Sequence, residues 1–145
     1  MNKPVIQKVV CGAVVIDDGK ALIIQRDVKE TFPGMWELPS GKKENMESAE
    51  QAIVREVKEE TGIEVRDIDY LTSLATVHKD KSPSFVISCT ANYRSGIITL
   101  QEEELQGHAW VSAKEAKGYQ LIDGILDEII MAEEKLKTGK KKEWS

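Results

Sequence analysis

Residues 41–63 read GKKENMESAEQAIVREVKEETGI, and most of this segment has the pattern of one well-capped helix. Ser48-Ala49-Glu50-Gln51 fits a capping box, in which the side chains of the serine and the glutamine satisfy backbone groups of the first turn. Gly62 is placed to adopt the left-handed conformation that commonly follows a last helical turn. The sequence therefore predicts a helix over residues 48–61.

One face of this helix is acidic where an apolar face is expected. At about 100° per residue, four apolar residues and three carboxylates share one arc: Ala49, Ala52, Ile53, Val57, Glu56, Glu59 and Glu60. Carboxylates at these spacings repel one another, and burying them without compensation costs still more. The alternative is a solvated helix with basic partners, but Arg55 only flanks the cluster and Lys58 points away. We therefore predict a bound divalent cation, which prefers oxygen ligands shared with substrate phosphates.

Length and composition favour one folded domain. The chain has 145 residues, of which 41% are hydrophobic and 31% are charged. We expect a single domain over residues 1–145, with a core over about 5–136 and a frayed tail at 137–145. The sequence shows no membrane-spanning run and no signal-peptide core. Cys11 and Cys89 lie in apolar surroundings and indicate buried thiols in the cytoplasm rather than a disulfide or a zinc site.

The net charge of −5 is unevenly distributed. Residues 135–145 hold five lysines and one glutamate, a net +4, so the rest of the chain carries −9. An acidic body is a poor match for a long nucleic acid. If the substrate is itself an anion, bound divalent cations would supply the missing positive charge.

The remaining pattern predicts mostly strands, with helices in the middle and at the end. We expect a hairpin over 5–27 that turns at 17–20, a long connection over 27–46, strands over 63–78 (broken near 67–69), 84–94 and 109–111, a short apolar piece at 97–100, an acidic loop at 102–107, and helices near 112–116 and 121–136. This order is typical of a mixed α/β or α+β domain in which helices cover a sheet.

The residues around the helix resemble the Nudix family. Gly41, Glu47 and residues 55–63, which read REVKEETGI, match every fixed position of the Nudix box. Residues 36–39 (WELP) resemble the approach to that box. Residues 104–111 resemble the acidic loop and the strand that follow it in the family. The resemblance covers about residues 5–135.

The resemblance implies an α/β/α sandwich, with a mixed central sheet flanked by helices, and a hydrolase that depends on Mg²⁺ or Mn²⁺. It implies that Glu56, Glu59 and Glu60 are metal ligands and that Glu56 also helps to activate water. The backbone of Gly41 would approach a metal closely, which suits a residue without a side chain. Arg55 is similar to the family residue that orients a helix carboxylate.

Two positions before the helix differ from what is common in the family. Relatives often have glycine where this chain has Ser40 and Met46, although neither is a fixed position of the box. The resemblance assigns Glu47 a structural role or a distant contribution. We expect these differences to change details of the loop rather than metal binding.

Acidic residues outside the helix are further candidates. Glu102, Glu103 and Glu104 form a cluster that could provide another metal ligand or the general base, and Glu104 is favoured by its spacing to the following strand. A solvated loop is the alternative. Glu44, in the loop before the helix, could also reach the metals.

Side chains near the second strand are candidates for substrate binding. Arg26 ends that strand, where a guanidinium could grip a phosphate, and a surface ion pair is the alternative. Trp36 is a candidate to stack on a base, as is Phe32, although loop aromatics more often pack against the core. His78 and His108 lack a metal-ligand spacing, so ordinary roles are favoured for both.

The resemblance implies a nucleotide-type substrate with a phosphoanhydride bond. For a small member of the family, a nucleoside triphosphate is favoured, giving a nucleoside monophosphate and pyrophosphate. Dinucleoside polyphosphates and nucleotide sugars stay open, as does a non-enzymatic Nudix domain that senses a nucleotide. Removal of pyrophosphate from RNA 5′ ends is disfavoured by the acidic body. Relatives often dimerise, so a homodimer is also open, whereas no membrane partner is expected.

Overall fold

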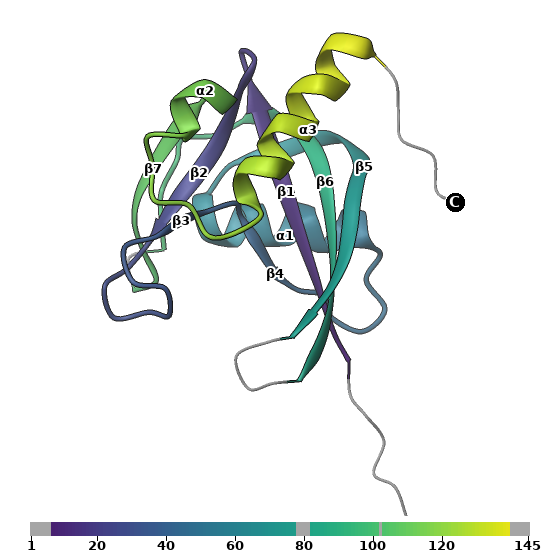
Figure 1. The fold of residues 1–145 in the computed structure, drawn as a ribbon. Coiled ribbons are helices and arrows are strands. Elements are labelled where there is room, and N and C mark those ends of the chain that lie inside the picture. The colour runs from purple at the N-terminus through teal and green to yellow at the C-terminus, as the bar shows by residue number, and fades with distance from the viewer. Residues whose placement is uncertain (1–6, 78–81, 102, 140–145) are drawn as a thin grey trace, which may run out of the picture.

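The computed structural model describes residues 7–77, 82–101 and 103–139 (Figure 1). The strands are β1 (Lys8–Asp17), β2 (Lys20–Arg26), β3 (Trp36–Glu37), β4 (Ser40–Lys42), β5 (Glu64–Val77), β6 (Pro83–Ser95) and β7 (Leu105–Val111). The helices are α1 (Ala49–Thr61), α2 (Ala113–Ala116) and α3 (Ile125–Thr138). None of the described helices has the length and apolar character needed to span a membrane.

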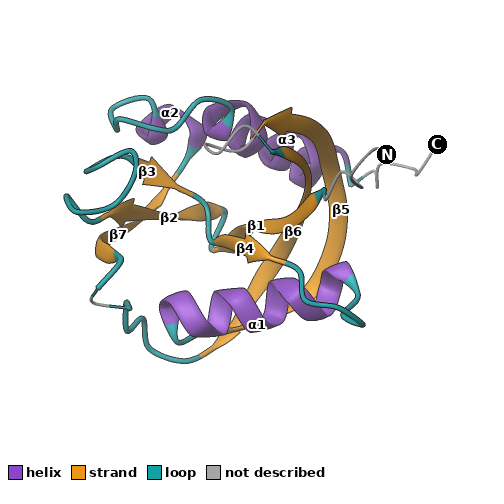
Figure 2. Cartoon of the chain, turned by 90° about the horizontal axis from the view of Figure 1, so that it is seen from below, coloured by secondary structure: helices purple, strands orange, loops and turns teal. Residues whose placement is uncertain are grey.

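The strands form one mixed sheet centred on β1. β1 runs parallel to β6, and it is antiparallel to both β2 and β4. The order across the sheet is β3-β2-β1-β6-β5, with β4 also paired to β1 and β7 also paired to β2. Figure 2 shows α1 on one face of the sheet and α2 with α3 on the other. The expected mixed sheet flanked by helices is therefore confirmed.

Two hydrophobic clusters hold the helices to the sheet, and β1 contributes to both. Cys11, Ala13 and Val15 belong to the cluster under α1. Val14 and Ile16 belong to the cluster under α3. Because both faces of β1 are buried, its sequence is an almost continuous apolar run instead of an alternating one.

The local signals for α1 and for the first hairpin are confirmed. Ser48 is the N-cap of α1 and forms the capping box with Gln51. Gly62 ends the helix with φ 78°, and its N–H donates to the carbonyl of Lys58. In the hairpin turn, Asp18 and Gly19 have φ of 50° and 75°, as a tight turn between twisted strands requires.

Several boundaries differ from the sequence expectation. The connection over 27–46 contains β3 and β4, which are too short to produce a periodic pattern. β7 begins at residue 105 rather than 109. The strand is not broken near 67–69 as expected, because β5 runs through these residues; Asp67 has φ 54° and the pairing of β5 with β6 shifts register there.

The segments that lie next to the ends of the two long helices are held by contacts with residues distant in the sequence. Residues 97–100 form no strand; the N–H of Thr99 instead donates to the carbonyl of Thr61 at 2.8 Å. α3 begins at residue 125 rather than 121, because Leu121 forms an isolated bridge with Trp36. α3 extends to residue 138, so the tail predicted to fray over 137–145 is helical at residues 137–138, while residues 140–145 lie outside the described residues.

Both cysteines are buried free thiols, as predicted. Burial raises the pKa of the Cys11 thiol and raises that of Cys89 to about 11. Both side chains therefore act as small apolar residues in the cluster under α1.

Candidate acidic site

The three helix carboxylates are not equally buried. Glu60 is only 8% exposed, the side chain of Glu56 is 14% exposed, and that of Glu59 is 55% exposed. The expectation that all three face inward is therefore wrong for Glu59. Its position at the edge of the helical arc explains the difference, because Glu56 and Glu60 lie nearer the centre of that arc.

Glu60 is a buried carboxyl group whose charged neighbours are acidic. Its Oε1 accepts a hydrogen bond from the backbone N–H of Ser40 at 2.8 Å. Burial, followed by the charge of Glu37, raises the pKa of Glu60 to about 9, and Glu56 and Glu104 act in the same direction. A cation beside this carboxyl group would favour its ionised form.

Gly41 lies against the carboxyl group of Glu56. β4 pairs with β1 here, with Gly41 opposite Cys11, and this pairing brings the backbone of β4 over α1. A β-carbon on Gly41 would overlap the carboxyl atoms of Glu56, so any larger residue here would force that side chain to move. Burial also raises the pKa of Glu56. The backbone of β4 and the two buried carboxylates of α1 thus share one narrow space.

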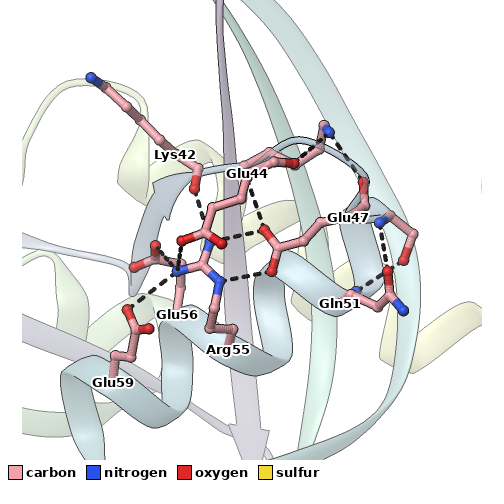
Figure 3. Close-up of polar contacts among 9 residues, drawn as sticks. Lys42, Glu44, Glu47, Gln51, Arg55, Glu56 and Glu59 are labelled. Atoms are coloured by element: carbon pink, nitrogen blue, oxygen red, sulfur yellow. Dashed lines mark hydrogen bonds and ion pairs between the residues drawn. The ribbon is translucent and has the colours of Figure 1, made fainter.

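Arg55 connects the helix carboxylates to the loop before the helix (Figure 3). Its Nε and Nη2 donate to the two oxygens of Glu47 at 2.7 and 2.9 Å. Its Nη1 donates to Glu56 at 2.8 Å and to Glu59 at 3.2 Å. Its Nη2 also donates to the carbonyl of Lys42 at 3.0 Å. A single planar guanidinium thereby fixes the loop and both carboxylates relative to one another.

This network separates the roles of the two acidic residues in the loop. Hydrogen bonds from Arg55 and from the backbone N–H of Glu44 lower the pKa of Glu47 to about 2. The Glu44 side chain is 69% exposed and lies 3.9 Å from Nη1 of Arg55. Glu47 is therefore engaged in holding the loop, whereas the side chain of Glu44 extends into solvent.

Glu37 is a member of the acidic group that the sequence pattern does not single out. Nη1 of Arg26 lies 3.3 Å from each of its carboxylate oxygens, yet burial still raises the pKa of Glu37. Glu37 and Glu104 each raise the pKa of Glu60, which places both near the helix carboxylates. The alternation of side chains along a strand could have indicated Glu37. Trp36 faces the cluster under α3, so the next residue on β3, Glu37, faces α1.

The remaining candidates lie in less central positions. Arg26 forms the ion pair with Glu37 that was considered as the alternative to phosphate binding. Glu103 and Glu104 are exposed, as is His108 on β7. Glu102 and His78 lie outside the described residues.

Trp36 lies on the face of the sheet opposite α1. Its ring packs edge-on against Tyr119 with centroids 4.9 Å apart, and it joins the cluster under α3. Its backbone also bonds to Gln120 and Ile122. The structure therefore does not bring Trp36 to the carboxylates. It shows Trp36 packed against the core, which was the alternative to stacking on a base.

The donor set suits a hard divalent cation. The side chains that gather here provide carboxylate oxygens, and the backbone of Gly41 lies beside them. In the part of the chain that the structure describes, no three acidic, histidine or cysteine side chains already form a closed cation site. Arg55 bonds one oxygen of Glu56 and one of Glu59, so each carboxylate has a second oxygen with which to bind a cation.

Comparisons with known proteins agree with this arrangement. The model of the NUDIX domain matches residues 6–130. A CTP pyrophosphohydrolase of Escherichia coli (strain K12) is 37% identical over 113 residues, which cover 77% of this chain and 81% of that protein. An 8-oxo-dGTP diphosphatase of Proteus vulgaris is 36% identical over 73 residues, which cover 50% of this chain and 65% of that protein.

The fold has a close counterpart among solved structures. The crystal structure of a MutT NUDIX hydrolase from Burkholderia pseudomallei superposes with a TM-score of 0.77 at 24% identity, covering 86% of this chain and 97% of the other. At this identity the likeness concerns the fold alone. Taken with the match to the family model, the chain belongs to the Nudix family, as a hydrolase that acts on pyrophosphate bonds.

Proposed function

We propose that this chain is a nucleoside triphosphate pyrophosphohydrolase that uses Mg²⁺ or Mn²⁺ and releases a nucleoside monophosphate and pyrophosphate. Members of the Nudix family typically use a divalent metal. The two relatives described above are named for CTP and for 8-oxo-dGTP, both nucleoside triphosphates. Dinucleoside polyphosphates and nucleotide sugars are the alternative substrates.

The buried carboxyl group of Glu60 carries this proposal. It lies in a place from which water is largely removed, and the charged groups that act on it are carboxylates. Such a group is costly for a fold unless a cation accompanies it. A site that holds cations beside carboxylates is suited to grasping the phosphates of a nucleotide.

We assign the residues of this site to two roles, metal binding and the orientation of the metal ligands. We assign metal binding to Glu56, Glu59 and Glu60, together with the carbonyl of Gly41. A divalent cation bound there neutralises phosphate charge and lowers the pKa of an attacking water. Arg55 holds Glu56 and Glu59 in orientation through its fixed hydrogen-bond geometry.

Two residues outside the helix complete the proposed assignments. Glu104 is the candidate for a further ligand or for the general base, because its charge acts on the same buried carboxyl group. Arg26 is the candidate contact for a substrate phosphate. Trp36 receives no role in substrate binding, because it packs on the other face of the sheet.

A substrate panel tests the reaction. Nucleoside triphosphates, dinucleoside polyphosphates and nucleotide sugars are incubated with Mg²⁺, and the released phosphate products are identified. We expect pyrophosphate and a nucleoside monophosphate from at least one triphosphate. Nucleotide binding without turnover of any compound would indicate the non-enzymatic sensing domain and contradict the proposal.

Replacing the buried carboxylate tests the assigned residues. Glu60→Gln keeps the shape of the side chain but cannot bind a cation as a carboxylate does, so we expect kcat to fall by about a hundredfold or more. Glu50→Gln, an exposed change on the same helix, is the matched control and should keep normal turnover. Normal turnover in Glu60→Gln would show that the metal ligands are wrongly placed.

We further expect the protein in the cytoplasm, where its two buried thiols would stay reduced. The acidic body disfavours long nucleic acids, including RNA 5′ ends, as substrates. A homodimer stays a prediction.

A further inference from the structure

The loop over residues 27–35, between β2 and β3, presents an exposed aromatic ring. Phe32 is 48% exposed and belongs to neither hydrophobic cluster. Its backbone has φ 51°, in the left-handed region that bulky residues rarely adopt. Large apolar side chains at strained positions on a surface often mark functional contacts. Packing therefore does not account for Phe32, in contrast to Trp36 in the same connection.

Hydrogen bonds hold this loop in one shape. The N–H of Gly34 donates to the carbonyl of Arg26 at 3.1 Å, and the N–H of Arg26 donates to Met35 at 2.9 Å. The side chain of Gln25 donates to the carbonyl of Gly34 at 3.1 Å, and Nε of Arg26 donates to the carbonyl of Thr31. The conformation that exposes the ring is thus organised before any substrate binds.

The same contacts place the loop at the border of the acidic site. Arg26 bonds to the loop with Nε and to Glu37 with Nη1, so one side chain links the loop to the acidic group. The N–H of Asp27 donates to the carbonyl of Glu104 at 2.9 Å. Figure 2 shows the loop on the side of the molecule where β3 and the start of β7 meet. A nucleotide whose phosphates lie at the carboxylates would meet Phe32 if its base extends toward this border.

We propose that Phe32 stacks on the base of the nucleotide substrate. This inference rests on the proposed function and adds a residue that binds the nucleoside part. A phenyl ring offers a π-face and no hydrogen-bond group. It would therefore strengthen the binding of a nucleotide relative to a sugar phosphate without a base, and it would discriminate little among the bases. Stacking of this kind contributes about a tenfold to hundredfold gain in affinity.

The test compares two substrates that differ only in the base. kcat/KM is measured for the best nucleoside triphosphate of the panel and for ribose 5-triphosphate, which lacks a base. We expect Phe32→Ala to lower kcat/KM at least tenfold for the nucleotide, chiefly through a higher KM. The value for ribose 5-triphosphate should stay within twofold of the wild type.

Further variants separate the ring from the backbone. Phe32→Tyr should keep normal kinetics because it keeps the ring. Phe32→Asn tolerates the left-handed conformation but has no ring, so it should behave like Phe32→Ala. Ile97→Ala removes another exposed apolar side chain, 86% exposed, and should affect neither substrate.

The outcomes distinguish this inference from the function on which it rests. Equal losses on both substrates, or no loss on either, would overturn stacking while leaving the proposed reaction intact. Normal kinetics in Phe32→Asn would also overturn it, because the ring would then be dispensable. A wild-type protein that cleaves no nucleoside triphosphate would overturn the proposed function first.

Discussion

Met46 has a backbone conformation that ordinarily belongs to glycine. Its φ is 69°, and its side chain is 97% exposed, so packing does not compensate for the strain. The residue lies in a turn in which the N–H of Glu47 donates to the carbonyl of Glu44. Glycine is favoured where a turn requires positive φ, in agreement with the glycine that the family resemblance leads one to expect here.

We therefore expect Met46→Gly to stabilise the protein by about 1 kcal/mol, since it relieves the left-handed strain at a smaller cost in chain entropy. Urea unfolding measures the change. Asn45→Gly is the control, because Asn45 is not among the residues with positive φ and should gain nothing. Equal effects of the two substitutions would show that φ at Met46 is not the cause.

At the scale of elements, α3 carries a partly buried carboxyl group, Glu128, on the side of the sheet away from the acidic site. One oxygen of Glu128 is buried without a hydrogen-bond partner among the described residues, while the group bonds to Ser88 of β6. Burial raises the pKa of Glu128, and the neighbouring charge of Asp127 acts in the same direction. The folded state therefore retains this proton to a higher pH than the unfolded state does.

This difference makes the docking of α3 sensitive to pH. Above the ordinary pKa of about 4.5, the folded state binds more protons than the unfolded state, so stability falls as pH rises toward the raised pKa. Glu128→Gln removes this loss, and we expect it to stabilise the protein more at pH 8 than at pH 5. Chemical unfolding at both values measures the difference. Glu134→Gln, exposed on the same helix, should show no such dependence. A gain that is the same at both pH values would contradict the assignment.

The elements also show which parts of the fold were predictable. α1 follows from its caps and its periodicity, and the first hairpin follows from Asp18-Gly19, because these signals are local. β3 and β4 are set by pairing with distant strands, and two or three residues show no period. The beginning of α3 depended on a bridge between Trp36 and Leu121, which sequence spacing cannot show.

Most members of the acidic site, including Gly41 and Glu104 outside the helix, were predictable from the sequence, but Glu37 was not. Glu56 and Glu60 follow from the arc they share with apolar residues and from the family box. Glu37 becomes a neighbour of Glu60 only through the sheet, since it lies on another element. The sequence left two roles open for Arg26, phosphate binding and a surface ion pair, and the structure shows an ion pair with Glu37.

At the scale of the whole molecule, the negative charge and the buried carboxylates act together. Outside its basic end the chain carries −9, and part of this charge is concentrated around Glu60. A ligand that binds the folded state alone stabilises it by mass action. Millimolar Mg²⁺ or Mn²⁺ should therefore raise the melting temperature.

Thermal unfolding with and without Mg²⁺ measures this effect, with NaCl at the same ionic strength as the control for screening. A chelator should reverse the shift, and Glu60→Gln should reduce it strongly. A melting curve that is indifferent to divalent cations would count against the proposed metal site.

The parallel pairing of β1 with β6 also bears on how the molecule is made. Lys8 pairs with Ser84, so the ends of this contact are far apart in the sequence. Contacts between distant segments slow folding, because a large loop must close before they form. During synthesis β1 leaves the ribosome well before β6, so apolar side chains of β1 that β6 helps to cover stay exposed until then. The sheet face that α1 covers is complete only after β1 and β6 have paired, so we expect the acidic site to form late in folding.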